Sequence, residues 1–382
     1  MNIEKRGDYM PYTEKDLIVP ARRYNNTKRK YLLVNTKQGK HVPVAPNEAV
    51  QMMAELGDKV KGLLSDGNLP ALVIGFAETA TAVGGVVASR LGACYRHTTR
   101  EDDPSIKNWL HFEETHSHAT EQKLALDDLE EVFRAVKSIV IVDDELTTGN
   151  TIINLLAALK DKVHGLDKKR LVAAALVSRV RGENLSRLAQ NGVEVVSLCE
   201  PDTTDEQYGA AIDRFDATGA SRVDVLPEDN VPISLISNLF EKNETSDMIV
   251  MSAFCKGKTL VLGTEEWMFH PLLCANQLRK NEGIDVRFYA TTRSPIAVCD
   301  DSSYPVRNGY EIHSLYDGLR KNYIYNLDQY DSAIVMSNCP FLIDKNTAGV
   351  KDIARALHTY GTKNVAFINQ VQFGMMTRGA DE

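Results

Sequence analysis

Two adjacent aspartates, Asp143 and Asp144, stand between an apolar run and a short polar loop, in the segment best suited to chemistry. The loop contains Thr147, Thr148 and Gly149, and an apolar-rich stretch typical of a helix follows it. Backbone N–H groups at the start of a helix, helped by threonine hydroxyls, can surround a phosphate, and the helix dipole favours its charge. Gly149 allows the tight turn that such a loop needs. The segment therefore predicts an anion-binding loop.

The two carboxylates are expected at the carboxyl end of a strand, where ligands bind in open α/β sheets. There they can accept hydrogen bonds from two vicinal hydroxyl groups. A phosphate site beside a diol site fits ribose 5-phosphate. The alternative interpretation is an ordinary strand–turn–helix whose acids only cap the turn.

The whole segment Ser138–Thr151 resembles the fingerprint of type I phosphoribosyltransferases. That fingerprint consists of four apolar residues, two acids, two variable residues, Thr-Thr-Gly and a threonine two positions on. The resemblance implies that Asp143 and Asp144 hold the ribose hydroxyls of 5-phosphoribosyl 1-pyrophosphate (PRPP). The residues that it implies for PRPP binding at the 5′-phosphate are Glu145, Leu146, Thr147, Thr148, Gly149, Asn150 and Thr151.

An earlier loop, Gly75–Gly85, resembles the pyrophosphate loop of the same family. It departs from many relatives in having Glu78 where they place a basic residue. Backbone N–H groups must then meet the pyrophosphate, or Mg²⁺ must bridge to it. A tight strand-to-helix turn without ligand is the alternative. The residues implied for this pyrophosphate loop are Ala77, Glu78, Thr79, Ala80 and Thr81.

A long connection follows the second expected strand and suggests a lid. In orotate-type relatives this connection carries basic residues, so the resemblance implies that Arg100, His116 and His118 neutralise the leaving pyrophosphate. Two alternatives remain open. The connection could be a solvated loop, or His111 and Glu114 could join the two histidines in a metal site, although the spacing fits no familiar zinc pattern.

The acceptor side of the site is indicated only by resemblance to orotate-type enzymes. Arg179 lies where a base-contacting arginine is expected, and an exposed arginine on a turn is the alternative. The basic run Ala21–Val44 resembles the hood that such enzymes place over the acceptor. A solvated edge is an equal alternative for that run.

The composition fits a two-domain globular protein. The chain has 382 residues, of which 43% are hydrophobic and 25% charged, with a net charge of −8. The negative charge gives no general attraction to nucleic acid or anionic membrane, so we expect small anionic ligands as partners. No signal peptide or run of about 20 apolar residues is present, and the six cysteines form no C-x-x-C pair. We expect a cytoplasmic protein with reduced thiols.

Short apolar runs alternate with amphipathic stretches from Leu69 onward, which predicts an α/β fold with a mainly parallel sheet and helices on both faces. A weakly periodic stretch around residues 206–230 predicts a connection to a second α/β domain. The expected limits are therefore 1–205, 206–230 and 231–382. The expected strands are Ala71–Gly75, Ala93–Thr99, Ser138–Asp143, Arg170–Ser178, Val193–Leu198, Thr259–Gly263, Asp285–Thr291, Ser332–Ser337 and Asn364–Asn369.

The two halves share anchors in the same order, which predicts an internal repeat. The matched pairs are His41–Val44 with Asn230–Ile233, Gly75 with Gly263, Thr98–Arg100 with Thr291–Arg293, Ser138–Val142 with Ser332–Met336, and His116-Ser117 with His313-Ser314. The repeat puts Ser337-Asn338 opposite the two aspartates, and no Thr-Thr-Gly follows. We therefore expect a degenerate second copy that does not bind the donor.

The strings Gly263–Pro271 and Tyr289–Ile296 resemble the domain named for its Thr-Arg-Ser-Pro (TRSP) motif. That domain is fused behind a phosphoribosyltransferase in bacterial tellurite-resistance and stress-response gene clusters. Here it would be a packing copy, which could form a homodimer, or a contributor to substrate binding.

The resemblance implies transfer of the phosphoribosyl group from PRPP to a nitrogenous base-like acceptor with release of pyrophosphate. Mg²⁺ would be bound with PRPP and not directly by the protein. The product would be a nucleoside-like metabolite linked to stress response. The rival functions are a PRPP-sensing regulator, a nucleotide phosphorylase or hydrolase, and a PRPP-forming synthetase, for which the sequence has no ATP-binding motif.

Overall fold

The computed structural model describes residues 12–24, 29–64, 66–113, 121–222, 234–237, 248, 251–339 and 347–369. The chain divides into two compact units. The first is built around Gln51–Asp202, and the second combines Lys15–Val50 with Thr203–Gly374. In the described chain, no helix is long and apolar enough to cross a membrane.

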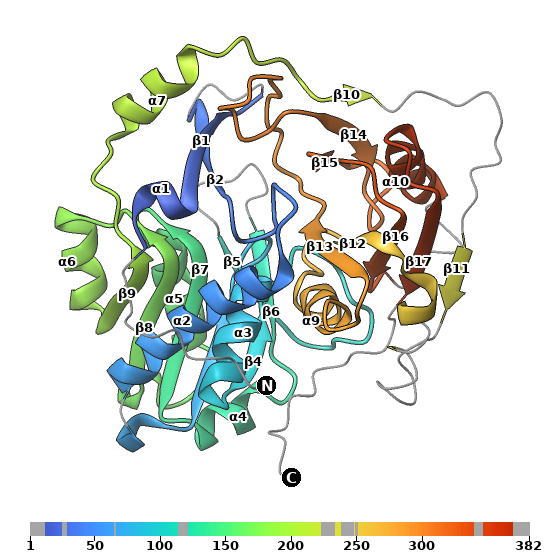
Figure 1. The fold of residues 1–382 in the computed structure, drawn as a ribbon. Coiled ribbons are helices and arrows are strands. Elements are labelled where there is room, and N and C mark those ends of the chain that lie inside the picture. Colours follow the sequence, from blue (N-terminus) through green and yellow to red (C-terminus); the bar gives the residue numbers. More distant parts are fainter. Residues whose placement is uncertain are drawn as a thin grey trace. The chain divides into compact units, whose positions relative to one another are not determined.

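The first unit is centred on a parallel sheet that has five strands within the described residues. Its central strands are almost continuous apolar runs with buried side chains, as expected where helices cover both faces of a parallel sheet. Figure 1 shows these strands in blue-green to green. In sheet order they are β4 (Cys94–His97), β3 (Ala71–Gly75), β7 (Ser138–Leu146), β8 (Arg170–Ser178) and β9 (Val193–Cys199).

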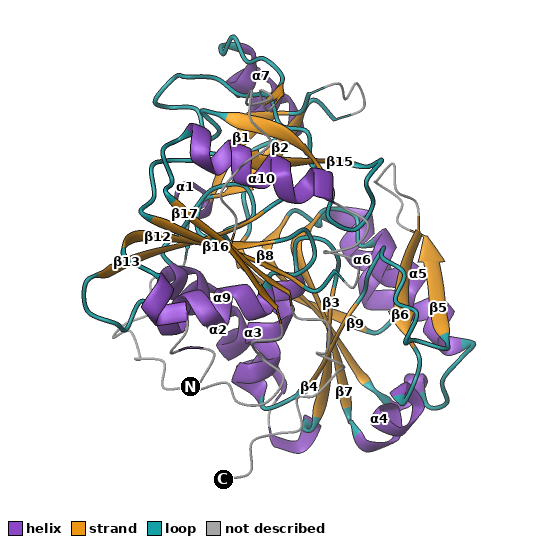
Figure 2. Cartoon of the chain, turned by 90° about the vertical axis from the view of Figure 1, so that its right-hand side faces the viewer, coloured by secondary structure: helices purple, strands orange, loops and turns teal. Residues whose placement is uncertain are grey.

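Helices pack on both faces of this sheet (Figure 2). One face carries α3, and the other carries α5 and α6. Long helix α2 crosses from the second unit into the first. The bounds are α2 (Pro46–Leu64), η1 (Asp66–Asn68), α3 (Thr81–Leu91), α4 (Leu129–Ala135), α5 (Asn150–Lys160), η2 (Leu166–Lys168) and α6 (Gly182–Gln190).

The long connection between β4 and β7 contains an antiparallel hairpin, β5 (Trp109–Glu113) with β6 (Glu121–Ala125). The sequence did not predict these strands, because their alternation is short and interrupted by charged residues. Leu110 and Phe112 nevertheless bury their side chains on one face. The hairpin tip lies outside the described residues.

The second unit has its own parallel sheet, again with five strands in the described part of the chain. Helices α9 and α10 lie on its opposite faces (Figure 1). In sheet order the strands are β11 (Ser234–Ser237), β17 (Asn364–Asn369), β16 (Ser332–Ser337), β12 (Gly257–Gly263) and β13 (Ile284–Ala290). The remaining elements are α7 (Asp205–Asp213), β10 (Ser221–Arg222), α9 (Phe269–Leu278), β14 (Gly309–His313), β15 (Lys321–Tyr325) and α10 (Thr347–Thr359).

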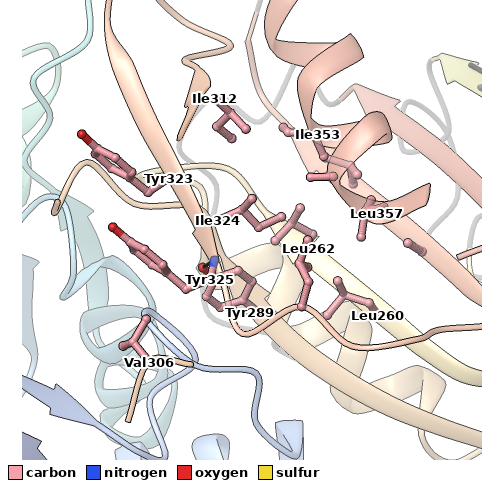
Figure 3. Packing of buried hydrophobic residues seen from close by; sticks show 14 of the residues in the cluster. Leu260, Leu262, Tyr289, Val306, Ile312, Tyr323, Ile324, Tyr325, Ile353 and Leu357 are labelled. Carbon is pink, nitrogen blue, oxygen red and sulfur yellow. Dashed lines mark hydrogen bonds between the residues drawn. The ribbon is translucent and has the colours of Figure 1, made fainter. Parts of the chain in front are cut away.

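The core of the second unit includes the N-terminal hairpin formed by β1 (Ile18–Arg22) and β2 (Tyr31–Asn35), which follows α1 (Glu14–Leu17). Figure 3 shows the packing of aromatic and aliphatic side chains from β12–β15 and α10. Ala21, Leu32 and Val34 belong to the same buried cluster. The basic run expected as a hood therefore packs its apolar face within the second unit. The contacts within the chain place residues 15–50 in this unit, whereas the sequence predicted them in a first domain of residues 1–205.

The predicted α/β fold class is confirmed in both units. Every predicted strand is present, with its ends within three residues of the expected ones. The main extension is β7, which continues three residues past Asp143 because it still pairs there with β8.

Candidate active site

The two aspartates lie on the part of β7 that projects beyond its neighbour β3. The pairing of β7 with β3 ends at Gly75 and Val142, whereas its pairing with β8 continues to Leu146. Asp143 and Asp144 therefore lie just past the end of β3, at the carboxyl end of the sheet, and both side chains are half-buried. Open α/β folds bind ligands at the carboxyl ends of their parallel strands.

The structure brings Asp144 into contact with the expected pyrophosphate loop. Thr79 Oγ1 donates a hydrogen bond of 2.6 Å to Asp144 Oδ1. The backbone N–H of Asp144 donates to Asp143 Oδ1 over 2.9 Å. Burial raises the pKa of Asp144 above its ordinary value, although the Thr79 hydrogen bond acts in the opposite direction. The two loops thus share one polar centre.

The expected phosphate loop is a sharp turn between β7 and α5. Gly149 has φ of 74°, in the left-handed region, and α5 begins at the next residue. A Cβ on Gly149 would come within 2.8 Å of Leu188 Cδ1, so glycine is needed both for the backbone and for close packing against α6. Among the residues named for this loop, Leu146 is buried and those from Thr147 to Thr151, apart from Gly149, are half-buried.

Arg187 on α6 holds the phosphate loop and was not predicted from the sequence. Its Nη2 donates to the carbonyl oxygen of Thr148 over 3.2 Å and to Asn150 Oδ1. Its Nε is buried without a hydrogen-bond partner among the described residues. The sequence showed Arg187 only as one of several charged residues on an amphipathic helix, so no local signal could identify it.

The expected pyrophosphate loop lies between β3 and α3. Gly75 and Gly84 pack back to back, because a Cβ on Gly84 would come within 2.9 Å of Gly75 Cα. This contact lets the start of α3 approach the strand end. The N–H groups of Ala77 and Ala80 donate to Thr98 Oγ1 and to the Phe76 carbonyl, so these two donors are used within the protein. Glu78 is buried.

Thr98 and Gln122 clamp this loop and were also missed from the sequence. Ala77 N–H donates to Thr98 Oγ1 over 2.8 Å, Thr98 Oγ1 donates to Gln122 Oε1, and Gln122 Nε2 donates back to the Ala77 carbonyl over 3.1 Å. The side chains of Thr98 and Gln122 are buried, at 0% and 1% relative exposure. Hairpin β5–β6 therefore helps to fix the pyrophosphate loop.

The predicted lid residues are only partly within the described chain. Arg100 is half-buried, and His111 is exposed with Nδ1 2.9 Å from Glu121 Oε1 across the hairpin. His116 and His118 lie outside the described residues. Across the described ranges, no three His, Cys, Asp or Glu side chains are grouped to hold a metal ion.

Arg179 pairs with Glu145, the residue that follows the two aspartates. Its Nη1 is 3.2 Å from Glu145 Oε1, with side-chain exposures of 14% and 18%. Its backbone N–H donates to the Leu146 carbonyl over 2.7 Å. A half-buried ion pair in this position differs from an exposed arginine on a turn, because its charges are largely removed from water.

Comparison with known proteins gives two family matches along the chain. Residues 17–201 match the sequence model described as phosphoribosyl transferase. Residues 238–352 match that described as the TRSP domain C-terminal to such a domain. No curated protein matches the chain. The first match contains both loops of the candidate site.

Solved structures were also compared. Adenine phosphoribosyltransferase from Rhodothermus marinus is 16% identical, with 49% of this chain and 96% of that chain covered and a TM-score of 0.35. The enzyme of the same name from Giardia lamblia, complexed with 9-deazaadenine, is 12% identical, with coverage of 49% and 95% and a TM-score of 0.38. Orotate phosphoribosyltransferase from Aeropyrum pernix is 18% identical, with coverage of 52% and 95% and a TM-score of 0.32.

Proposed function

Since this chain belongs to the phosphoribosyl transferase family over residues 17–201 and carries a TRSP domain behind it, we propose that it transfers the phosphoribosyl group of PRPP to a base-like nitrogen acceptor. Pyrophosphate is the other product. The observation that carries the proposal is the contact between the two loops, made by the hydrogen bond from Thr79 to Asp144. A diol site, a phosphate turn and a pyrophosphate loop are then adjacent within one unit.

In this proposal Asp143 and Asp144 accept hydrogen bonds from the ribose hydroxyls. The bond from Thr79 to Asp144 must open or be shared when the ribose enters, because a lone pair used by Thr79 is not available to the diol. The turn from Thr147 to Thr151 receives the 5′-phosphate through backbone N–H groups and hydroxyls at the start of α5.

Arg187 adds positive charge to the 5′-phosphate site. Its guanidinium already contacts both sides of Gly149, through Thr148 and Asn150. Guanidinium groups bind phosphate oxygens with strong charge-assisted hydrogen bonds. Arg187 is therefore proposed to order the turn and to offset the charge of the bound phosphate.

Departure of pyrophosphate leaves positive charge on the ribose and adds negative charge to the leaving group. We assign Arg100, His116 and His118 to neutralise that leaving group, as the family resemblance implies. Buried Glu78 supplies no positive charge. Mg²⁺ would be held by oxygens of PRPP and not directly by the protein, and it would supply Lewis-acid stabilisation of the leaving group.

The acceptor is proposed to lie next to Arg179. Because Glu145 already pairs with this arginine, the acceptor meets a carboxylate–guanidinium pair instead of an isolated positive charge. Such a pair can both donate and accept hydrogen bonds, which suits a base with adjacent N–H and C=O groups.

The proposed setting is synthesis of a nucleoside-like metabolite linked to stress response and tellurite resistance, as the TRSP resemblance implies. The six cysteines are thiols and not disulfides, which fits a cytoplasmic enzyme. A net charge of −8 favours small-molecule partners over nucleic acid.

The site assignment is tested by calorimetry with PRPP on the double variant Asp144→Asn, Thr148→Ala. We expect no measurable PRPP binding, because the variant loses a diol acceptor and a hydroxyl of the phosphate turn. Asp161→Asn, at the far end of α5, is the control and should bind PRPP like the wild type. Unchanged affinity in the double variant would reject the assigned site.

Turnover is tested by screening candidate bases for PRPP-dependent release of pyrophosphate. Release that requires both a base and PRPP supports the transferase. PRPP binding without release for any base would indicate a sensor, and ribose 5-phosphate as product would indicate a hydrolase.

A further inference from the structure

The sheets of the two units share one order of strands. In the first unit the order β4-β3-β7-β8 matches β13-β12-β16-β17 in the second. In both units an antiparallel hairpin, β5–β6 or β14–β15, precedes the third of these strands along the chain. The fifth position differs, since β9 follows its sheet in sequence and β11 precedes it. The shared order allows residues of the two units to be paired.

Backbone hydrogen bonds fix that pairing at the ends of the central strands. In the first unit Thr98 N–H donates to the Gly75 carbonyl over 2.9 Å. In the second unit Thr291 N–H donates to the Gly263 carbonyl over 3.1 Å. The glycines end equivalent strands, and the threonines follow the neighbouring edge strands.

The next contact identifies the residue that replaces Ala77. Ala77 N–H donates to Thr98 Oγ1 over 2.8 Å, and Glu265 N–H donates to Thr291 Oγ1 over 3.0 Å. Glu265 therefore takes the position of Ala77 in the loop that the proposed function assigns to pyrophosphate. The same register makes Arg293 the counterpart of Arg100.

The Glu265 carboxylate lies in a buried cluster of positive groups. Its Oε2 is 2.7 Å from Arg293 Nε and 2.8 Å from Arg320 Nη2, and its Oε1 accepts a hydrogen bond from Ser314 Oγ. Arg293 also contacts Glu266 over 3.2 Å. Glu265 itself is fully buried, at 0% relative exposure. A buried carboxylate is stable only with partners of this kind.

Two guanidinium groups and a hydroxyl around one oxyanion are also the groups that bind phosphate. Ala77 places no carboxylate at the position of Glu265, whereas the next residue in both loops is a buried glutamate, Glu78 or Glu266. Glu265 is therefore the carboxylate that the second unit has in addition. In the second unit the protein provides the anion itself.

The position equivalent to Asp144 is also contacted by a side chain of the second unit. Asn338 lies two residues after the strand pair that corresponds to Gly75 and Val142, so it replaces Asp144. The Tyr316 hydroxyl donates to Asn338 Oδ1 over 2.7 Å and lies 2.9 Å from Thr264 Oγ1. The Tyr316 hydroxyl thus contacts the position that the proposed function assigns to the ribose, where the first unit has the Thr79 hydroxyl on Asp144.

We propose that the second unit contains a former donor site occupied by its own side chains. The Glu265 carboxylate replaces a pyrophosphate group, and the Tyr316 hydroxyl replaces a ribose hydroxyl. Removing the carboxylate of Glu265 opens a site for inorganic pyrophosphate that Arg293, Arg320 and Ser314 line. The choice of pyrophosphate as the anion rests on the proposed function, whereas the contacts around Glu265 do not depend on it.

The test is pyrophosphate binding by the triple variant Asp144→Asn, Thr148→Ala, Glu265→Ala, in which the first site no longer holds the ribose and 5′-phosphate of PRPP but keeps its pyrophosphate loop. We expect calorimetry to detect one more pyrophosphate per chain than in the double variant without Glu265→Ala. The unfolding midpoint should rise by about 3–5 °C at ten times Kd. Arg293→Met added to the triple variant should abolish this additional binding.

The matched control is Glu311→Ala in the double-variant background, which removes an acid from the partly exposed pair with Lys321. It should gain no pyrophosphate binding. If the triple variant is unfolded alone, pyrophosphate should restore its folding, as judged by circular dichroism. A folded triple variant that binds no more pyrophosphate than the double variant, or an unfolded one that pyrophosphate does not restore, would overturn the inference. PRPP binding by the wild type is a separate measurement, so a failed proposed function would be recognised independently.

Discussion

The end of β7 in the first unit and the end of β16 in the second occupy the same position in sheets of the same order. At the first, a threonine of the neighbouring loop contacts an aspartate through one hydrogen bond. At the second, Tyr316 contacts the equivalent asparagine, and the loop carries a glutamate held by two arginines. At the second strand end the chain thus carries a carboxylate, Glu265, at a position where the first has alanine.

If the second unit holds a former donor site, as proposed, the site was lost while the fold was kept. On that proposal, a few polar side chains at the strand ends take the place of ligand contacts, while the buried strands remain. Variants that act at only one of the two ends therefore test the difference directly.

The largest effect is expected for Gly149→Ala. This glycine belongs to the phosphate turn, whose Thr-Thr-Gly has no counterpart after Ser337-Asn338 in the sequence of the second unit. PRPP affinity should fall by roughly 100-fold, because left-handed backbone costs an alanine about 1–2 kcal/mol and the new methyl meets Leu188. Gly192→Ala is the control, since Gly192 has the same φ of 74° and open space around its Cβ. Calorimetry should show normal PRPP affinity for that control, and an equal loss in both would contradict the role of the turn.

Arg187→Gln should reduce PRPP affinity by about tenfold to a hundredfold, because hydrogen bonds of a charged group contribute about 1.5–3 kcal/mol. Pyrophosphate alone should bind as well as before, since it does not reach the phosphate turn. Arg134→Gln, which removes an exposed arginine paired with Glu130, is the matched control. A similar loss for both ligands would show that Arg187 acts only by stabilising the fold.

Gln122→Leu and Asn322→Leu compare the two loop clamps. Asn322 Nδ2 contacts Thr291 Oγ1 over 3.4 Å, as Gln122 contacts Thr98 in the first unit. Each variant should lose about 1–3 kcal/mol of unfolding free energy. Only Gln122→Leu should also raise KM for PRPP, by roughly tenfold, because only its loop positions a ligand. Steady-state kinetics with both variants would refute this if KM changed equally.

The smallest effect is expected in the pH dependence of stability for Asp144→Asn. The pKa of Asp144 is raised in the folded chain, so its ionised form destabilises the fold. The penalty is absent below the ordinary aspartate pKa of about 3.9, grows as pH rises from there to the folded value, and is constant above it. The variant should therefore unfold at a higher temperature than the wild type at pH 7 but not near pH 4. Calorimetric unfolding that shows a loss of stability at pH 7 would contradict this sign.

The strands and the fingerprint were predictable because they are local patterns. Apolar runs such as Arg170–Ser178 are long enough to identify buried strands, and the spacing from Asp143 to Thr151 is fixed by one strand–turn–helix. Arg187 and Gln122 were missed because their roles arise from contacts 37 to 45 residues away in sequence. Equally, the basic N-terminal run gave no sign that Leu32 and Val34 enter the core of the other unit.

That N-terminal hairpin also sets an order for folding during synthesis. The second unit is discontinuous, because Lys15–Val50 must wait for Thr203 and the residues beyond it before its core can form. The 152 residues that separate Val50 from Thr203 take roughly 8–30 s to synthesise. During that time the first unit is completed, while the apolar face of the hairpin still lacks its partners. Ending the chain near residue 205 would make this temporary exposure permanent.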